Sequence, residues 1–282
     1  MSVHLISDDM LAAPARHIFL SPHYDDIALS AGATARRLAD LGRQPETVIV
    51  FGSEPDPETP LSTFAAAMHE GWGLGSSEVI GRRRAEEERA AEAIGAAVHL
   101  LPFHDAIYRG HTYLSDEDLF SQPSDAEHSV PQAIIAALGL PTSPTPDIRI
   151  YAPLGVGGHV DHQLVFTAAA HLAAAGWDIW LYEDVPYALR AGALAQRLDN
   201  VGQEHVVAPL GVVPAEAAWD AKIQGILSYP SQLETIFLHY VGVAPTRMGI
   251  SDALTAYARK KDEKIIGEQF WSFANAPTWQ GS

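Results

Sequence analysis

Apolar and polar residues alternate along the chain in a pattern that predicts strands separated by helices. Short apolar runs with the length of buried strands occupy residues 17–21, 48–52, 98–103, 147–154 and 179–185. Longer segments with helical spacing lie between them, at residues 26–42, 78–95, 130–139 and 159–176. Strands that alternate with helices of this length form right-handed βαβ units. We therefore expect a Rossmann-like α/β fold, with a mostly parallel sheet and helices on both faces.

Two long connections interrupt this alternation, at residues 53–77 and 104–129. Connections of this length within a compact domain usually form lids or the walls of binding sites. We expect them to lie over the C-terminal edge of the strands, where parallel α/β sheets bind ligands.

The C-terminal part of the chain is less regular. Its pattern predicts one strand at 205–213 and one helix at 218–229, and the remainder stays unassigned. The length of 282 residues fits a single α/β domain, with a core over about 15–190 and a C-terminal extension over 200–282.

The composition is that of an ordinary globular protein, with 47% hydrophobic and 19% charged residues. No apolar run approaches the roughly 18 residues of a membrane span, and the N-terminus lacks a basic segment followed by an apolar one. A cytoplasmic location is the expectation. Because the chain has no cysteine, any metal site must use His, Asp and Glu.

The net charge restricts the partners. Asp and Glu number 35 against 18 Lys and Arg, a net charge of −17. This charge repels nucleic acid and anionic membranes, so we expect neither as a partner. A small-molecule substrate is the expected partner, and a homo-oligomer is a possible assembly.

Two clusters of ionisable residues follow predicted strands. "SPHYDDIALSAG" (21–32) places His23, Asp25 and Asp26 after the first strand, and "PLGVGGHVDHQLV" (153–165) places His159, Asp161 and His162 after the fourth. Both clusters belong at the carboxyl edge of the sheet, and they converge if these two strands are neighbours. Two imidazoles and one carboxylate bind Zn²⁺ while leaving a position for water, which is the arrangement of a catalytic zinc site.

Three other interpretations stay open on the residues alone. Asp25 or Asp26 can cap a helix N-terminus. His23 and Asp25 with a distant His also form the triad of a non-haem Fe(II) oxygenase, although those enzymes are jelly rolls rather than βα repeats. The third interpretation is a non-catalytic binding module on a decayed hydrolase fold.

The two clusters together resemble the PIG-L/LmbE-type zinc deacetylases, whose signature is His-Pro-Asp-Asp-Glu after the first strand and His-x-Asp-His after the fourth. The similarity extends to "RRRAEEERAAEAIG", "LPFHD" and "YEDVPYA" within about residues 17–190, and more weakly to "KIQGILSYPSQL" (222–233). The family's Pro and Glu are replaced here by Tyr24 and Ile27. Neither position is a ligand or the base in the family, but the lost Glu leaves tight zinc binding in question.

The resemblance implies a role for each residue of the clusters. His23, Asp26 and His162 would bind one zinc ion per chain, and Asp25 would be the general base for the zinc-bound water. His159 would polarise the carbonyl or protonate the leaving amine, and Asp161 would orient and charge-stabilise His159.

Further positions are candidates for substrate contact. In the resemblance, Arg83 and Asp105 face the substrate. Tyr187 lies where the fifth strand meets the sheet edge, together with Glu183 and Asp184, whose carboxylates could hold hydroxyls or an amine. Trp72, in the first long connection, could stack on a substrate ring.

The two clusters and the resemblance together imply a zinc-dependent amidohydrolase that removes an acyl group, most simply acetyl, from the amine of a small amino-sugar conjugate or secondary metabolite. Members of the resembled family act on N-acetylglucosaminyl lipids, thiol-cofactor precursors, chitin fragments and antibiotic intermediates. The absence of a membrane anchor and the charge of −17 favour a small soluble substrate over a membrane glycolipid.

Overall fold

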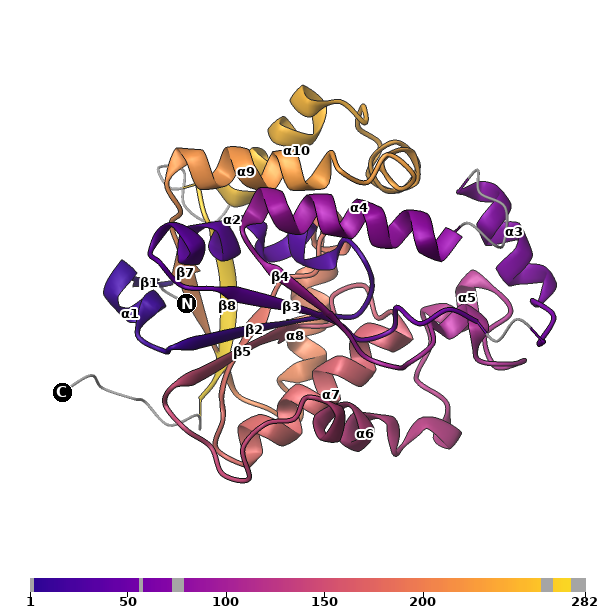
Figure 1. The fold of residues 1–282 in the computed structure, drawn as a ribbon, viewed down its shortest axis with the longest axis horizontal. Helices are drawn as coiled ribbons and strands as arrows, with labels where there is room; N and C mark the ends of the chain where they lie inside the picture. Colours follow the sequence, from indigo (N-terminus) through magenta and orange to yellow (C-terminus); the bar gives the residue numbers. More distant parts are fainter. Residues whose placement is uncertain (1–2, 56–57, 73–78, 260–265, 275–282) are drawn as a thin grey trace.

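An eight-stranded sheet runs through the middle of the molecule (Figure 1). The computed structural model describes residues 3–55, 58–72, 79–259 and 266–274. The strand order is β1-β7-β8-β6-β5-β2-β3-β4, and all neighbours are parallel except β8, which is antiparallel to β6 and β7. The strands are β1 (His4–Ile6), β2 (Arg16–Ser21), β3 (Pro45–Ile49), β4 (Ala97–Leu100), β5 (Ile148–Pro153), β6 (Asp178–Tyr182), β7 (Val207–Val212) and β8 (Glu268–Phe273). The predicted, mostly parallel sheet is confirmed.

Helices cover both faces of the sheet. Helices α2, α4 and α9 pack against one another on one face, and α6, α7 and α8 lie on the other (Figure 1). The helices are α1 (Asp8–Ala12), α2 (Asp26–Asp40), α3 (Thr63–Gly71), α4 (Val79–Ile94), α5 (Asp116–Leu119), α6 (Val130–Ala137), α7 (Val160–Ala174), α8 (Ala193–Val201), α9 (Glu216–Ile226), α10 (Arg247–Arg259) and a π-helix, η4 (Glu234–Val241). Short 3₁₀ helices occur at η1 (Ala106–Tyr108), η2 (Asp125–Glu127) and η3 (Tyr187–Leu189). None of the described helices is both long enough and apolar enough to cross a membrane.

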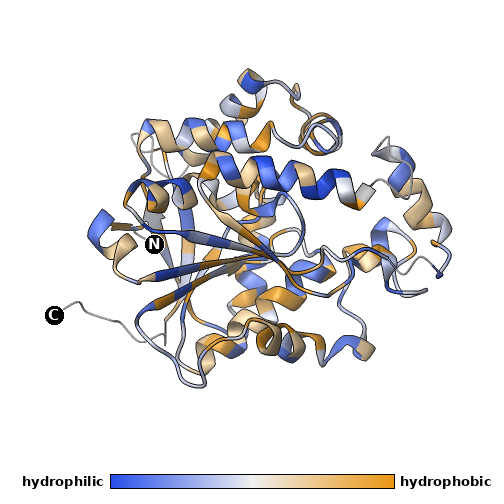
Figure 2. Cartoon of the chain, viewed as in Figure 1, coloured by the Kyte–Doolittle hydropathy of each residue, from blue (hydrophilic) through white to orange (hydrophobic). Residues whose placement is uncertain are grey.

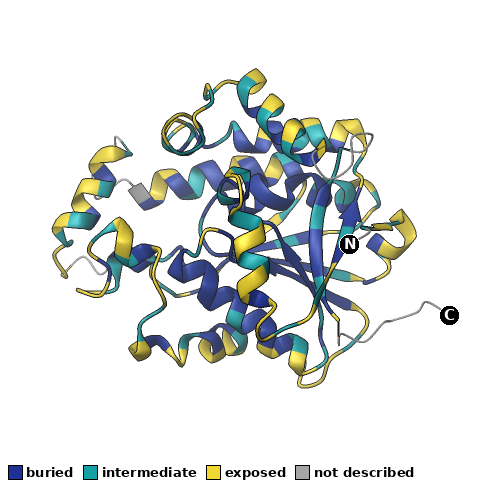
Figure 3. Ribbon diagram, turned by 180° about the vertical axis from the view of Figure 1, so that it is seen from behind, coloured by how far each residue is buried: buried dark blue, intermediate teal, exposed yellow. Residues whose placement is uncertain are grey.

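The core lies between the sheet and its two helical layers. In β2 the side chains of Ile18 and Leu20 pack on the α7 side, while Phe19 packs on the α2 side, as the two-residue period of a strand requires. Hydrophobic residues concentrate along the strands and α7 (Figure 2), and the central strands are buried (Figure 3). Strands buried on both faces explain why their sequences read as continuous apolar runs.

The strands that carry the two His/Asp clusters are neighbours. β2 pairs with β5 in parallel, with Phe19 opposite Tyr151. β3 begins at Pro45, three residues before the predicted strand, because Pro45, Glu46 and Thr47 pair with β2 although they are not an apolar run. Because β2 and β5 are adjacent, the two His/Asp clusters that follow them lie side by side at the carboxyl edge of the sheet.

The two long connections lie beyond the carboxyl ends of the strands. The first contains α3, and the second contains η1, α5 and η2. In Figure 1, α3 and α5 stand at the end of the molecule toward which β2 and β3 point. Their predicted position over the C-terminal edge of the sheet is confirmed for the described residues.

The C-terminal extension completes the sheet and one helical layer. It supplies the predicted strand as β7 and the predicted helix as α9, and it adds β8, which the sequence pattern did not identify. Lys222 of α9 is buried and its Nζ lies 2.6 Å from Oε1 of Glu268 in β8. The Glu268 carboxylate also accepts the backbone N–H groups of Ala33 and Thr34, next to a break in the helical geometry of α2 at Ala31. This buried pair ties the extension to the helix that begins at Asp26.

Replacing Lys222 with methionine is expected to lower the free energy of unfolding by about 3–5 kcal/mol, because Glu268 is left buried without its cation. Denaturant unfolding measures the loss. The exposed pair Arg36–Asp40, 2.8 Å apart, is the matched control, and Arg36→Ala should cost no more than about 1 kcal/mol. Adding Glu268→Gln to Lys222→Met should recover part of the lost stability, because it removes the buried charge. If Lys222→Met costs no more than Arg36→Ala, the buried ion pair does not stabilise the fold as expected.

Candidate active site

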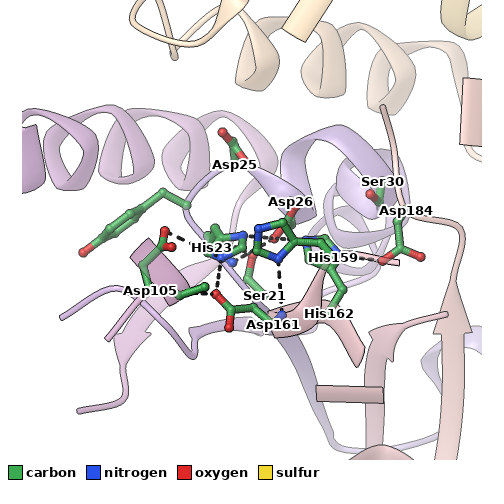
Figure 4. A network of polar contacts seen from close by, with 12 residues as sticks. Ser21, His23, Asp25, Asp26, Ser30, Asp105, His159, Asp161, His162 and Asp184 are labelled. Atoms are coloured by element: carbon green, nitrogen blue, oxygen red, sulfur yellow. Dashed lines mark hydrogen bonds and ion pairs between the residues drawn. The ribbon is translucent and has the colours of Figure 1, made fainter. Parts of the chain in front are cut away.

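The turns after β2 and β5 bring six ionisable side chains together at the carboxyl edge of the sheet (Figure 4). His23, Asp25 and Asp26 lie between β2 and the first turn of α2, and His159, Asp161 and His162 lie at the start of α7. The backbone before α7 turns sharply at Gly157, whose φ of 88° and close approach to the Tyr187 ring leave no room for a Cβ. The glycines of this motif therefore serve the backbone path that delivers the second cluster.

His23 is fixed through its Nε2 atom. Nε2 lies 2.8 Å from Oδ2 of Asp161, whose carboxylate is fully buried and also accepts the N–H of Ala106 and binds Arg109. Although burial opposes ionisation of Asp161, Arg109 and His23 hold the pKa of this carboxyl well below its usual range. The Nδ1 atom of His23 is left to face Asp26.

His162 is fixed in the same way by a second buried carboxylate. Its Nδ1 lies 2.7 Å from Oδ1 of Asp184, and Oδ2 of Asp184 accepts the backbone N–H groups of Gly155 and Val156 at 2.8 Å each. The Nε2 atom of His162 is buried and has no hydrogen-bond partner within the described part of the chain. A buried imidazole nitrogen without a partner is costly unless a further group binds it.

The free nitrogens of the two histidines face one oxygen of Asp26. Oδ2 of Asp26 lies 3.5 Å from Nε2 of His162 and 3.8 Å from Nδ1 of His23. Ligands of a tetrahedral zinc at about 2.0–2.1 Å stand roughly 3.4 Å apart, so these separations fit a shared cation. Metal-binding histidines characteristically donate their other ring N–H to a carboxylate, as Asp161 and Asp184 allow here. The residues present therefore fit a divalent metal ion.

Charge around His23 also favours a cation. Burial alone would lower the pKa of His23, but the carboxylates of Asp105, Asp161 and Asp26 raise it to about 9. One nitrogen from each of His23, His159 and His162 lies within 4.8 Å of the others, so His159 belongs to the same group of donors. The cluster can hold a metal ion.

Asp25 occupies the N-cap position of α2, but its side chain makes no capping hydrogen bond with the described residues. Its carboxylate instead lies 3.2 Å from Nη2 of Arg83. Burial raises the pKa of Asp25 to about 7, against the opposing effect of Arg83 and with a further contribution from Asp26. The helix-capping interpretation therefore does not explain the carboxylate of Asp25.

His159 is held by the backbone rather than by the carboxylate of Asp161. Its Nδ1 accepts the N–H of Asp161 at 3.2 Å, which leaves the ring hydrogen of a neutral imidazole on Nε2. Burial and the neighbouring His23 lower the pKa of His159 well below its usual value. The Asp161 carboxylate itself contacts His23 and Arg109, so Asp161 orients His159 through its backbone N–H, and its charge opposes this lowering of the His159 pKa.

A cavity of about 490 Å³ opens onto the cluster. The predicted substrate residues Arg83, Asp105 and Tyr187 all line it, as does Trp72. The Arg83 guanidinium lies 5.2 Å from the centre of the Trp72 ring. The structure thus brings the metal candidates, Asp25 and the substrate candidates into one site.

Glu183 and Asp184 do not line this cavity. Glu183 is buried and accepts hydrogen bonds from Tyr257 and from Nε1 of Trp271, and Asp184 braces His162. The suggestion that these acids hold substrate hydroxyls is therefore wrong, because both carboxylates are already engaged inside the protein.

Several residues of the site were missed by sequence reasoning. Arg109 lies in the second long connection, and its partner Asp161 is 52 positions away. The segment around η4 forms part of the cavity wall, with Gln232, Thr235, Ile236, His239 and Tyr240. Only the weak similarity at 222–233 indicated that the extension is involved.

The two departures from the family signature are accommodated by packing. Tyr24 is buried and its hydroxyl donates to the carbonyl of Gly52 at 2.8 Å. Ile27 is buried in the apolar cluster that contains Phe19 and Tyr151. A glutamate at position 27 would place its charge among these apolar side chains, so isoleucine suits this chain's core.

Comparisons with known proteins agree with this geometry. The model of the PIG-L family, described as GlcNAc-PI de-N-acetylase, matches residues 18–173. The chain is 31% identical over 231 residues to the 2'-N-acetylparomamine deacetylase of Streptomyces fradiae, covering 78% of this chain and 74% of that protein. It is 29% identical over 189 residues to the protein of the same name from Niallia circulans, covering 60% and 66% respectively.

Solved structures share the fold. A deacetylase of the teicoplanin biosynthesis pathway superposes with a TM-score of 0.74 at 23% identity, over 93% of this chain and 99% of that chain. The matched family range begins within β2 and contains both His/Asp clusters and strands β3 to β5. The chain therefore belongs to the PIG-L family.

Proposed function

We propose that this protein is a zinc-dependent N-deacetylase that acts on a small amino-sugar conjugate. One observation carries the proposal: the free nitrogens of His23 and His162 face the same Asp26 oxygen, and His23, Asp26 and Asp25 line one cavity. A zinc ion bound there through His23, Asp26 and His162 would act as a Lewis acid and make a water molecule more acidic. One ion per chain satisfies the donors.

Asp25 is the proposed general base. Burial raises the pKa of Asp25 above that of an ordinary carboxyl group, which makes the carboxylate a better acceptor for a proton from the attacking water. Arg83, 3.2 Å away, keeps the carboxylate oriented and favours its ionised form. The metal ligand Asp26 follows Asp25 directly in the chain, so base and metal site share one turn of backbone.

His159 is the proposed electrophilic group. With Nδ1 occupied by the Asp161 N–H, its Nε2–H donates a hydrogen bond while the ring stays neutral. Such a donor suits the substrate carbonyl as negative charge develops on its oxygen. Protonation of the leaving amine then falls to the group that received the water's proton, which is Asp25.

The walls of the cavity favour a sugar that carries additional amines. Aromatic side chains from four segments line it, namely Trp72, Phe120, Tyr187 and Tyr240, and such rings stack on sugar faces and attract ammonium groups. Asp105 and Asp116 add carboxylates, while Arg83 is the one Lys or Arg among the described residues that line the cavity. The related deacetylases named for 2'-N-acetylparomamine support an amino-sugar secondary metabolite as the substrate.

An Fe(II) oxygenase is disfavoured by the same observations. The mostly parallel sheet covered by helices is not a jelly roll. In the oxygenase triad Asp25 would bind the iron, whereas here its carboxylate binds Arg83. The binding-module alternative does not account for Asp25 and His159, which a metal site of His23, Asp26 and His162 does not need.

A substrate series tests the proposal. We expect the zinc-loaded protein to release acetate and a free amine from soluble N-acetylated amino-sugar conjugates, and faster from those that carry further ammonium groups than from N-acetylglucosamine. Acetate and primary amine are measured in parallel, so that both products of amide hydrolysis are counted. Activity only on a lipid-linked N-acetylglucosaminide in vesicles contradicts the proposed substrate class, and a dependence on oxygen and a 2-oxo acid contradicts hydrolysis.

A further inference from the structure

The backbone of Asp25 is in a conformation that its surroundings must enforce. Its φ is 90°, and among the described residues it is the one non-glycine residue with a positive φ. Residues other than glycine adopt such angles at functional sites, where the neighbouring structure holds them. The question is which groups hold Asp25.

Two charged residues one turn apart on α4 contact the Tyr24–Asp25 peptide from both sides. Arg83 donates from Nη2 to the carbonyl of Tyr24 at 3.0 Å and to the carboxylate of Asp25 at 3.2 Å. Glu87 accepts the backbone N–H of Asp25 on Oε2 at 3.1 Å. Arg83 is 6% exposed and Glu87 3%, so water does not compete freely for these contacts.

Glu87 is itself held by the C-terminal extension. The hydroxyl of Tyr229 donates to the same Oε2 at 2.6 Å, and Tyr229 is buried. The atom that receives the Asp25 N–H is therefore fixed from the opposite side by a residue 142 positions away from Glu87. Tyr229 belongs to the "KIQGILSYPSQL" segment (222–233). The catalytic clusters do not explain why this segment is similar to the family.

We propose that Glu87, oriented by Tyr229, is a positioning residue that holds the backbone of Asp25 in its positive-φ conformation and so aims the carboxylate of Asp25 at the reacting water. This inference rests on the proposed role of Asp25 as the base. Removing the Glu87 carboxylate leaves the Asp25 N–H buried without an acceptor and allows the peptide to relax. A displacement of about 1 Å at a reacting group lowers rates on the order of 100-fold.

The test combines two variants of Glu87 with two backgrounds, using the full zinc-loaded chain. Glu87→Ala is expected to lower kcat by about 10–100-fold with KM and zinc content unchanged. Glu87→Gln keeps an oxygen that can accept both hydrogen bonds, so its kcat should return close to the wild-type value. In an Asp25→Asn background, Glu87→Ala should cause no further loss, because the base it positions is already absent.

Glu86 provides a matched control. It precedes Glu87 on α4 and is fully buried, but its carboxylate accepts from the backbone N–H and the hydroxyl of Ser231 instead. Any effect of Glu86→Ala on kcat is expected to be the same in the wild-type and Asp25→Asn backgrounds. If Glu87→Ala lowers kcat by the same factor in the wild-type and Asp25→Asn backgrounds, Glu87 has a purely structural role and the proposal is overturned.

A structural measurement separates this inference from the proposed function. In a crystal structure of Glu87→Ala, φ of residue 25 should leave the positive region, and an unchanged φ overturns the positioning role. If Asp25→Asn alone leaves kcat unchanged, the proposed base is wrong. If Asp25→Asn lowers kcat but Glu87→Ala does not, the base stands and the positioning role is wrong.

Discussion

The Asp25→Asn variant is expected to fold, to retain its zinc and to turn over substrate about 10²–10⁴-fold more slowly than the wild type. An amide cannot accept the proton of the attacking water, which is the step assigned to the Asp25 carboxylate. Asparagine tolerates positive φ better than most residues, so the backbone at φ 90° need not change. The amide oxygen can still accept from Arg83, which the structure places 3.2 Å from the carboxylate.

Saturating-substrate kinetics and elemental analysis measure this effect together. The zinc content of Asp25→Asn should match that of the wild type, which shows that the loss lies in catalysis and not in the metal site. An unchanged kcat at full zinc content would mean that another group accepts the proton.

The His162→Ala variant is expected to lose its zinc on dialysis, and its activity with it. Nε2 of His162 is buried and has no hydrogen-bond partner in the described structure. It lies 3.5 Å from Oδ2 of Asp26, so metal binding is the role proposed for this atom. The loss in zinc affinity should exceed the roughly 10–100-fold that removal of a supporting carboxylate costs.

Asp184→Asn supplies that comparison, because Asp184 contacts His162 through Nδ1 and not through the proposed ligand atom. We expect it to weaken zinc binding by about 10–100-fold while leaving a measurable affinity. If His162→Ala keeps its full metal content while Asp25→Ala loses its metal, the assignment of His162 as a ligand is wrong. That result would favour the oxygenase triad, in which Asp25 binds the metal.

Much of the central fold was predictable because the parallel strands are buried on both faces. β2, β5 and β6 appear in the sequence as apolar runs, and the helices between them end at glycines such as Gly42 and Gly95, both with positive φ. β8 was not predictable, since its place between β6 and β7 depends on pairing with strands more than 50 residues away. The wall built by η4 was missed because its position depends on packing against other elements, as Phe237 packs with Val185 and Ile250.

The assignment of roles within the site shows a similar division. The sequence predicted which six ionisable residues converge, because both clusters follow strands at one edge of the sheet. Their partners could not be read from spacing: Asp161 binds His23 rather than His159, and Asp184 supports His162 rather than the substrate. Such contacts depend on the directions of side chains that come from separate elements.

By itself, then, the sequence determined the fold class, the membership of the PIG-L family and the residues that carry the proposed chemistry, because local periodicity and short motifs encode them. The tertiary structure decided which ring nitrogens face the metal position, which carboxylates are already engaged and how the C-terminal extension reaches the site. These depend on long-range packing, as when the Tyr229 hydroxyl and the Asp25 N–H both donate to Oε2 of Glu87 from positions far apart in the chain. Hydrogen bonds of this kind join separate elements, so they depend on how the helices pack together and not on local sequence.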